Sequence, residues 1–313
     1  MQYVGLQQQI SRNNRYSILL LIAFPALLLG MLYAIVWVIS INSNNDYRSD
    51  PMNANQVFLG AVPIVLAIVG IWFAIAYAGH ASFIRGATGS KPLERKENMR
   101  VYNLVENLCI QLGIKTPQIY IIDDDSLNAF ASGINEKTYS ISLSKGIIDK
   151  LNDEELEGVI AHELTHIQNR DVRLLIVSII FVGIFSFLAE MALRSLRFSG
   201  GKKKNEGYIM LAIIAVTAVC YFISLFLRFG ISKSREYLAD AGAAEMTKKP
   251  YALANALRKI DADPNIEVVQ RKDVAQMFIE NPQANQAKKM SISGMFATHP
   301  PIQKRIELLE QFV

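Results

Sequence analysis

Four long apolar runs alternate with polar segments along the chain. The runs cover about residues 18–41, 57–79, 174–193 and 208–227, and each is long enough to cross a bilayer as a helix, which takes about 20 apolar residues. The first has no charged residue and carries Trp37 near one end, where an amphipathic ring suits the membrane interface. The third contains Glu190 and the fourth is followed by Arg228. The second pair is therefore predicted as either a transmembrane or a membrane-associated hairpin.

The polar segment 84–173 has the pattern of a folded soluble region. Asn152 and Glu155 have the spacing of a capping box, which marks the start of a helix. The expected elements are a helix over 97–112 ended by Gly113, strands over 118–122, 128–132 and 138–143, and a helix from Asn152.

The polar segment 228–313 is mostly helical in pattern. Helices are expected over 232–246, after Pro250 and from Pro301. Together the two segments and the four apolar runs predict a mainly α protein with a small β-sheet, built as a multi-pass helical membrane protein.

Composition supports a membrane protein and excludes other classes. Hydrophobic residues make up 51% of the chain and charged residues 19%, which is too apolar for an ordinary soluble protein. The net charge of +4 is small and no basic patch interleaved with aromatics occurs, so nucleic-acid binding is not expected. The two cysteines, Cys109 and Cys220, form no Cys-x-x-Cys pair, and neither a disulfide nor redox chemistry is expected.

Basic residues that flank the first two apolar runs predict their orientation. Arg12 and Arg15 precede the first run, whereas the loop after it has only Arg48. Because lysine and arginine favour the cytoplasmic side, residues 84–173 and the N-terminus are predicted to be cytoplasmic. A count of four crossings places the loop at 194–207 outside the cell. This loop is nevertheless basic, which disagrees with that placement; its basic residues are Arg194, Arg197, Lys202, Lys203 and Lys204.

This orientation gives a domain division. Residues 1–83 form an N-terminal transmembrane hairpin, residues 84–173 and 228–313 together form a cytoplasmic domain, and residues 174–227 form the second hairpin.

The candidate chemistry lies in the helix that begins at Asn152. His162 and His166 are four residues apart, so both imidazoles project from one face and can reach a single metal ion. Glu163 lies beside that face, where it can act as a base toward a metal-bound water. An apolar stripe at helical spacing can pack into the domain and leave the histidine face toward a cleft; it comprises Leu156, Ile160, Leu164 and Ile167.

A catalytic zinc site needs a third protein ligand. Glu236 is the best candidate, although Glu245 and Glu280 compete, and Glu236 could instead be a surface carboxylate paired with neighbouring basic residues. Asp240 lies four residues further on the same helix face and can accept a hydrogen bond from the outer nitrogen of a ligand histidine. Asp171, between two arginines, is interpreted as the polar collar of a membrane helix.

At these positions the chain resembles the HtpX-like family of membrane metallopeptidases, relatives of the CAAX prenyl-protein endopeptidases. The resemblance covers about residues 84–313, and the first 80 residues match in hydropathy only. It rests on the His-Glu-Leu-Thr-His motif at 162–166 continuing into Asn169 and Asp171, on Glu236 with Asp240, on Asn128-Ala129-Phe130-Ala131, and on His299-Pro300-Pro301 followed by Arg305.

The resemblance implies a gluzincin-type metalloprotease domain with one Zn²⁺ per chain, held by His162, His166 and Glu236. It implies a strand at Asn128, Ala129 and Phe130 that aligns an extended polypeptide substrate. His299 is a candidate for stabilising the oxyanion, with a simple structural role as the alternative.

The implied function is zinc-dependent endopeptidase activity on membrane or misfolded proteins, in protein quality control at the cytoplasmic face of the cell (inner) membrane. The alternatives are a selective processing peptidase of the prenyl-protease type and a non-catalytic membrane scaffold. The sequence specifies neither the natural substrate nor the oligomeric state.

Overall fold

The computed structural model describes residues 6–43, 54–198, 204–229, 233–262 and 300–312. The chain separates into two compact units, each formed by segments distant in sequence. The helical unit comprises Tyr16–Ala78 and Val177–Arg228, and the mixed α/β unit comprises Met1–Arg15, Gly79–Ile176 and Phe229–Val313.

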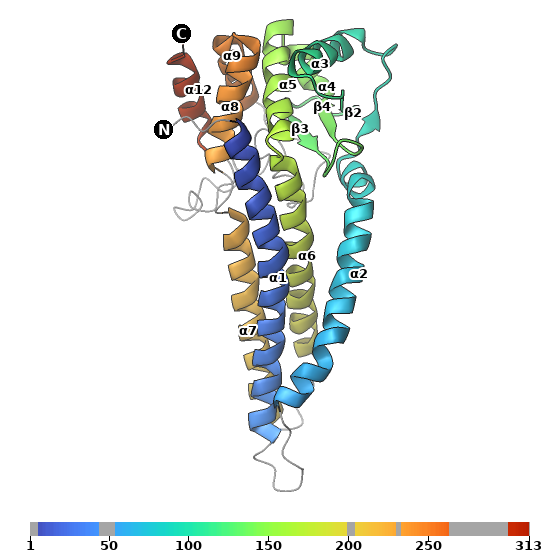
Figure 1. Ribbon diagram of the computed structural model, residues 1–313, viewed down its shortest axis with the longest axis vertical. Coiled ribbons are helices and arrows are strands. Elements are labelled where there is room, and N and C mark those ends of the chain that lie inside the picture. Colours follow the sequence, from blue (N-terminus) through green and yellow to red (C-terminus); the bar gives the residue numbers. More distant parts are fainter. Residues whose placement is uncertain (1–5, 44–53, 199–203, 230–232, 263–299, 313) are drawn as a thin grey trace. The chain divides into compact units, whose positions relative to one another are not determined.

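The helical unit consists of long helices (Figure 1), namely the greater part of α1 (Leu6–Ser43), α2 (Ala54–Thr88), α6 (Asp171–Phe198) and α7 (Lys204–Phe229). Aromatic rings join three of them. Phe181 of α6 stacks on Phe24 of α1 at a centroid distance of 4.7 Å and on Phe73 of α2 at 5.3 Å. Large apolar side chains such as Ile22, Leu59 and Ile75 point outward and are about two-thirds exposed. Such an apolar surface suits contact with lipid.

Three of the described helices are long and apolar enough to cross a membrane. They contain the segments Ser11–Ser40, Ala54–Thr88 and Asp171–Arg194. In α7 the apolar stretch that can be assessed, Leu211–Ile223, is shorter, so the predicted fourth crossing stays a prediction.

The mixed α/β unit contains a four-stranded sheet. Its strands are β1 (Lys91–Pro92), β2 (Gln118–Ile122), β3 (Ala129–Ser132) and β4 (Ser140–Ser144), in the order β1-β2-β4-β3. β2 and β4 are parallel, and the other two pairs are antiparallel. Gly133 turns the chain between β3 and β4 with φ 114°, and a Cβ there would lie 2.5 Å from the Thr138 carbonyl oxygen.

The helices of this unit are α3 (Met99–Leu112), α4 (Lys145–Lys150), α5 (Asp153–Gln168), α8 (Lys233–Thr247), α9 (Pro250–Ala262) and α12 (Ile302–Glu310). Helix α5 is central, because it contacts α3, β3, β4, α8 and α9 (Figure 1). The predicted apolar stripe of α5 packs as expected: Leu156, Ile160 and Leu164 are fully buried in the core.

The element boundaries follow local chemistry. Asn152 and Glu155 form the predicted capping box, with hydrogen bonds of 2.9 and 3.0 Å between each side chain and the other's backbone N–H. The helix expected from residue 97 begins at Met99, because Asn98 caps it by accepting the Val101 N–H. The predicted mainly α fold with a small sheet is confirmed.

Candidate metal centre

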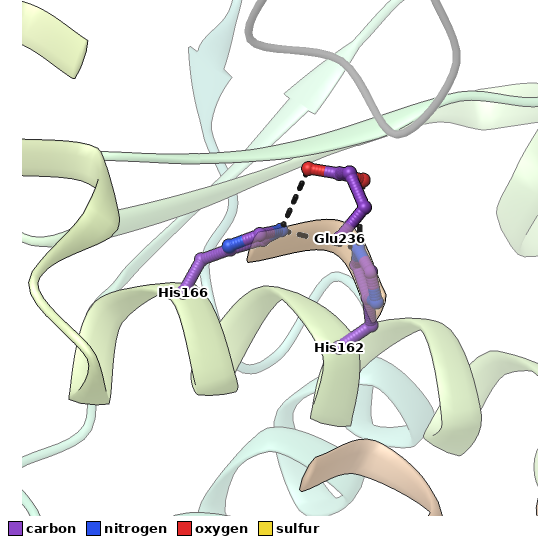
Figure 2. Close-up of side chains that lie close together, drawn as sticks. All are labelled: His162, His166 and Glu236. Atoms are coloured by element: carbon purple, nitrogen blue, oxygen red, sulfur yellow. Dashed lines mark hydrogen bonds and ion pairs between the residues drawn. The ribbon is translucent and has the colours of Figure 1, made fainter. Parts of the chain in front are cut away.

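The two histidines of α5 point toward the same place as a glutamate of α8 (Figure 2). The Nε2 atoms of His162 and His166 are 3.2 Å apart. Glu236 Oε1 lies 3.5 Å from His166 Nε2, and Glu236 Oε2 lies 3.7 Å from His162 Nε2. Tetrahedral ligands at the usual zinc distances of about 2.0–2.1 Å lie about 3.3–3.4 Å from one another. The three donor groups thus have a spacing that fits one zinc ion.

Each histidine presents its outer nitrogen to a carboxylate. His162 Nδ1 lies 3.0 Å from Asp240 Oδ1, and His166 Nδ1 lies 3.0 Å from Asp171 Oδ2. A carboxylate at this position fixes the tautomer and the ring orientation, so that the Nε2 lone pair points inward. The interpretation of Asp171 as a mere polar collar is wrong, because this side chain is buried and orients His166.

Arg305 of α12 anchors Asp240. Its Nε and Nη2 donate to the two carboxylate oxygens at 2.8 and 2.7 Å, and its Nη1 lies 3.4 Å from Glu236 Oε2. The side chain is 1% exposed, so this bidentate pair is shielded from solvent. Burial by itself raises the pKa of Asp240, but the charge and hydrogen bonds of Arg305 outweigh burial and hold that pKa below its ordinary value.

Two ionisable groups of α5, His162 and Glu163, also have perturbed pKa values. Burial lowers the pKa of His162, but the neighbouring Asp240 and Glu236 outweigh that effect and raise it to about 9. Burial raises the pKa of Glu163, an effect partly offset by the nearby histidines and by a hydrogen bond from the Ala131 backbone N–H. A carboxylate with a raised pKa is a better proton acceptor at neutral pH, as a general base requires.

Strand β3 lies at one edge of the sheet formed by the described strands. The Ser144 N–H donates to the Asn128 carbonyl at 3.0 Å. Because bonded pairs alternate in an antiparallel ladder, Ala129 and Ala131 turn their backbone groups away from β4. Asn128 and Phe130 are fully buried, and the Asn128 side chain accepts the Ala129 N–H.

The structure brings together His162, Glu163, His166, Glu236 and Asp240. His299 lies outside the described residues. Sequence reasoning gave Arg305 no role beyond its place in a motif and missed Asn13, which donates to Asp171 at 2.6 Å. No local pattern marks Asn13, since 158 residues separate it from Asp171.

Comparisons with known proteins identify the family of the chain. A family model described as peptidase family M48 matches residues 95–313. A protein named Protease HtpX homolog from Bacteroides fragilis strain YCH46 is 59% identical over the full length of both chains. A protein of the same name from Dictyoglomus turgidum is 39% identical over 80% of this chain and 82% of its own. A crystal structure of S. mikatae Ste24p aligns with a TM-score of 0.48 at 19% identity, covering 90% of this chain and 61% of that one.

Proposed function

This chain belongs to peptidase family M48, and from that premise we propose that His162, His166 and Glu236 hold one Zn²⁺ while Glu163 acts as the catalytic base. The chain is a membrane-associated zinc metalloprotease. One observation carries the proposed ligand assignment. The three donor groups lie within 4.8 Å of one another, with the outer nitrogen of each histidine on a buried carboxylate.

Glu163 performs the proton transfers of peptide hydrolysis. When bound, zinc acidifies a water molecule and polarises the scissile carbonyl. Glu163 accepts the proton of the attacking water and delivers it to the leaving amine. The Ala131 N–H donates to the Glu163 carboxylate and orients it. The base is therefore positioned by β3, the strand beside which the substrate lies.

The substrate is a polypeptide added as a further strand along β3. Asn128, Ala129 and Phe130 form this edge. The Ala129 N–H donates to the Asn128 side chain and the Ala131 N–H to Glu163, so the backbone carbonyls of Ala129 and Ala131 are the groups directed toward an added strand. Main-chain hydrogen bonds are indifferent to the substrate's side chains. Such an edge suits a protease that acts on many membrane or unfolded proteins, as quality control requires.

The remaining assignments rest on the sequence. Arg12 and Arg15 precede the apolar run of α1 and belong to the unit that holds the metal centre, whereas the polar segment after that run has only Arg48. This asymmetry supports an active site in the cytoplasm, and we assign the chain to the cell (inner) membrane. His299 precedes two prolines in the motif that resembles the family's, and we assign it to stabilisation of the oxyanion.

A cleavage assay on a generic unfolded protein tests this function, with Glu163→Gln as the key variant. The variant is expected to keep its zinc and to lose about 10²–10⁴-fold in kcat, because the amide cannot accept the proton of water. Zinc content is measured by atomic emission, and a chelator should abolish wild-type cleavage.

The matched control is Glu157→Gln on the same helix, where the carboxylate pairs with Lys249 outside the metal centre. The control should cleave normally. Near-normal cleavage by Glu163→Gln would exclude Glu163 as the base. Cleavage of a prenylated peptide but not of the unfolded protein would favour the selective processing alternative.

A further inference from the structure

The sheet of the mixed α/β unit has one apolar face and one face that is polar around Ser140. Alternate residues point to opposite faces, and Ile119, Ala131 and Ile141 belong to the core shared with α5. The other face carries hydroxyls: Ser140 is paired in register with both Ser132 and Gln118. Ser132 and Ser140 are 4% and 7% exposed. The two hydroxyls hydrogen-bond to each other at 2.7 Å, and a buried sheet face is ordinarily apolar, so a polar face of this kind is unusual and suits a polar ligand.

A cavity of about 140 Å³ lies on this polar face. Arg85, near the end of α2, and Lys137 contribute to its lining, and no described lining residue is an aspartate or glutamate. The Arg85 guanidinium is positioned by Tyr120, whose hydroxyl it approaches at 3.4 Å and over whose ring it lies at 5.7 Å. Two cations and several hydroxyls without a carboxylate favour an oxyanion with several acceptor oxygens.

The position of Arg85 in α2 suggests the source of the anion. The apolar run of α2 ends near Gly79. At a rise of 1.5 Å per residue, Arg85 lies about 9 Å further along the helix. The headgroup layer on each side of a bilayer is about 5–8 Å thick, so the Arg85 backbone lies at its outer boundary and the long side chain can reach back into it. We propose that this cavity binds a phosphate group, and that the group comes from a phospholipid headgroup.

Binding to full-length protein in detergent tests the proposal with three probes: dioleoylphosphatidylglycerol, dioleoylglycerol, which lacks the phosphate, and inorganic phosphate. Phosphatidylglycerol should remain bound in native mass spectra and dioleoylglycerol should not. Arg85→Gln should weaken retention by at least about tenfold, because a charge-assisted contact is lost. Arg95→Gln, at an exposed arginine paired with Glu106, is the matched control and should bind normally.

Ser142→Val is a second, independent variant, which keeps the proposal testable if Arg85→Gln fails to fold. It removes a lining hydroxyl without changing charge, and it should also weaken the retention of phosphatidylglycerol. Binding of inorganic phosphate alone would keep the phosphate site but overturn the lipid source. Equal retention of dioleoylglycerol, or retention unaffected by both Arg85→Gln and Ser142→Val, would overturn the site itself.

The first turns of α1, before its apolar run, contain a buried asparagine. Asn13 is 1% exposed and belongs to the mixed α/β unit. Its Nδ2 donates to Asp171 Oδ1 at 2.6 Å and to the Asn169 carbonyl at 2.8 Å. Arg170, between these two partners, has φ 61°, a conformation that non-glycine residues rarely adopt. Asn13 therefore holds both sides of the strained junction between α5 and α6.

This junction bears directly on the metal centre. Asp171 Oδ2 orients His166 Nδ1 at 3.0 Å, and its other carboxylate oxygen accepts from Asn13. Arg235 also contacts Asp171, but at 3.4 Å to the carbonyl and 3.9 Å to the carboxylate. We infer that Asn13 is a positioning residue for His166, an inference that rests on the proposed role of His166 as a metal ligand.

Zinc affinity, measured by competition with a chelator on full-length protein, tests the role of Asn13. Asn13→Ala should bind zinc about 10–100-fold more weakly, as is typical when the partner of a ligand histidine is disturbed. Asn14→Ala is the matched control, since Asn14 accepts a hydrogen bond of 3.2 Å from the exposed side chain of Arg170. Its zinc affinity should stay within about twofold of wild type.

Two further measurements make the outcome decisive. The visible absorption of the cobalt-substituted protein should change in Asn13→Ala, whereas a purely structural role would leave the spectrum of the folded fraction unchanged. His166→Ala separates this inference from the proposed function. If His166→Ala keeps its zinc, the ligand assignment fails; if it loses zinc while Asn13→Ala has normal affinity and spectrum, only the inference about Asn13 fails.

Discussion

The two ligand histidines differ in their surroundings. His162 is fully buried, and its carboxylate partner Asp240 is held by the buried Arg305. His166 keeps 13% of its side chain exposed, and its partner Asp171 is held by a neutral amide at 2.6 Å. His162 therefore forms the rigid side of the centre, while His166 lies on the side that solvent can reach.

Glu236→Ala should abolish stoichiometric zinc binding. Glu236 supplies both oxygens that face the histidines, at 3.5 and 3.7 Å, and two imidazoles alone do not make a catalytic zinc site. The loss should exceed the roughly 10–100-fold effect of disturbing a ligand's partner. Metal analysis of the purified variant measures it. Glu245→Ala, on the same helix, is the control, and a normal zinc content in Glu236→Ala would transfer the third-ligand role elsewhere.

Zinc uptake by the metal-free protein should depend on pH. The pKa of His162 is raised to about 9, so below that pH zinc must displace a proton from the imidazole. The sign follows: affinity increases with rising pH, by about tenfold per unit for one displaced proton, and levels off above about pH 9. Chelator competition across this range measures the slope. An affinity that stays constant from neutral pH to pH 9 would contradict the proton displacement.

At the scale of elements, the metal centre depends on how closely α8 approaches α5. Gly242 of α8 faces Thr165 of α5, and a Cβ at Gly242 would lie 2.6 Å from Thr165 Cγ2. Thr165 is buried and its hydroxyl donates to the Ala161 carbonyl at 2.8 Å, so its side chain has no room to move away. This contact sets the distance between Glu236 and the histidines.

Gly242→Ala should therefore destabilise the protein by about 1–3 kcal/mol, the usual cost of an overpacked contact, and should also weaken zinc binding. Thermal unfolding with and without zinc measures both effects. Gly86→Ala in α2, where a Cβ would meet no atom within 4 Å, is the control and should be neutral or slightly stabilising. Unchanged stability of Gly242→Ala would show that α8 can shift without cost.

At the scale of the whole molecule, the first two membrane helices fix the side on which the chemistry occurs. Accessibility to a membrane-impermeant maleimide tests the orientation in spheroplasts of cells that express variants lacking Cys109 and Cys220. Asn44→Cys, directly after the last described residue of α1, should react in intact spheroplasts. Lys96→Cys, at an exposed residue of the mixed α/β unit, should react only after lysis. The reverse pattern would put the active site outside.

The sequence by itself determined three of the apolar helices, most elements of the mixed α/β unit and the motif, but it did not predict β1 or α4. Apolar length and the capping box of Asn152 with Glu155 are local signals, because bilayer thickness and unpaired helix N–H groups act on neighbouring residues. His162, Glu163 and His166 are likewise local, since one helical turn aligns the two histidines. Glu236 was only the best of three candidates until the resemblance to a family singled it out.

Only the tertiary structure decided what surrounds these groups. Arg305 and its partner Asp240 are 65 positions apart, and Asn13 and its partner Asp171 are 158 positions apart. Asp171 reaches His166 only because the chain turns at Arg170, which has a positive φ. No periodicity encodes such contacts, because they depend on which faces of packed helices meet. A buried charge or amide needs a partner wherever the fold supplies one, and the fold alone supplied Arg305 and Asn13.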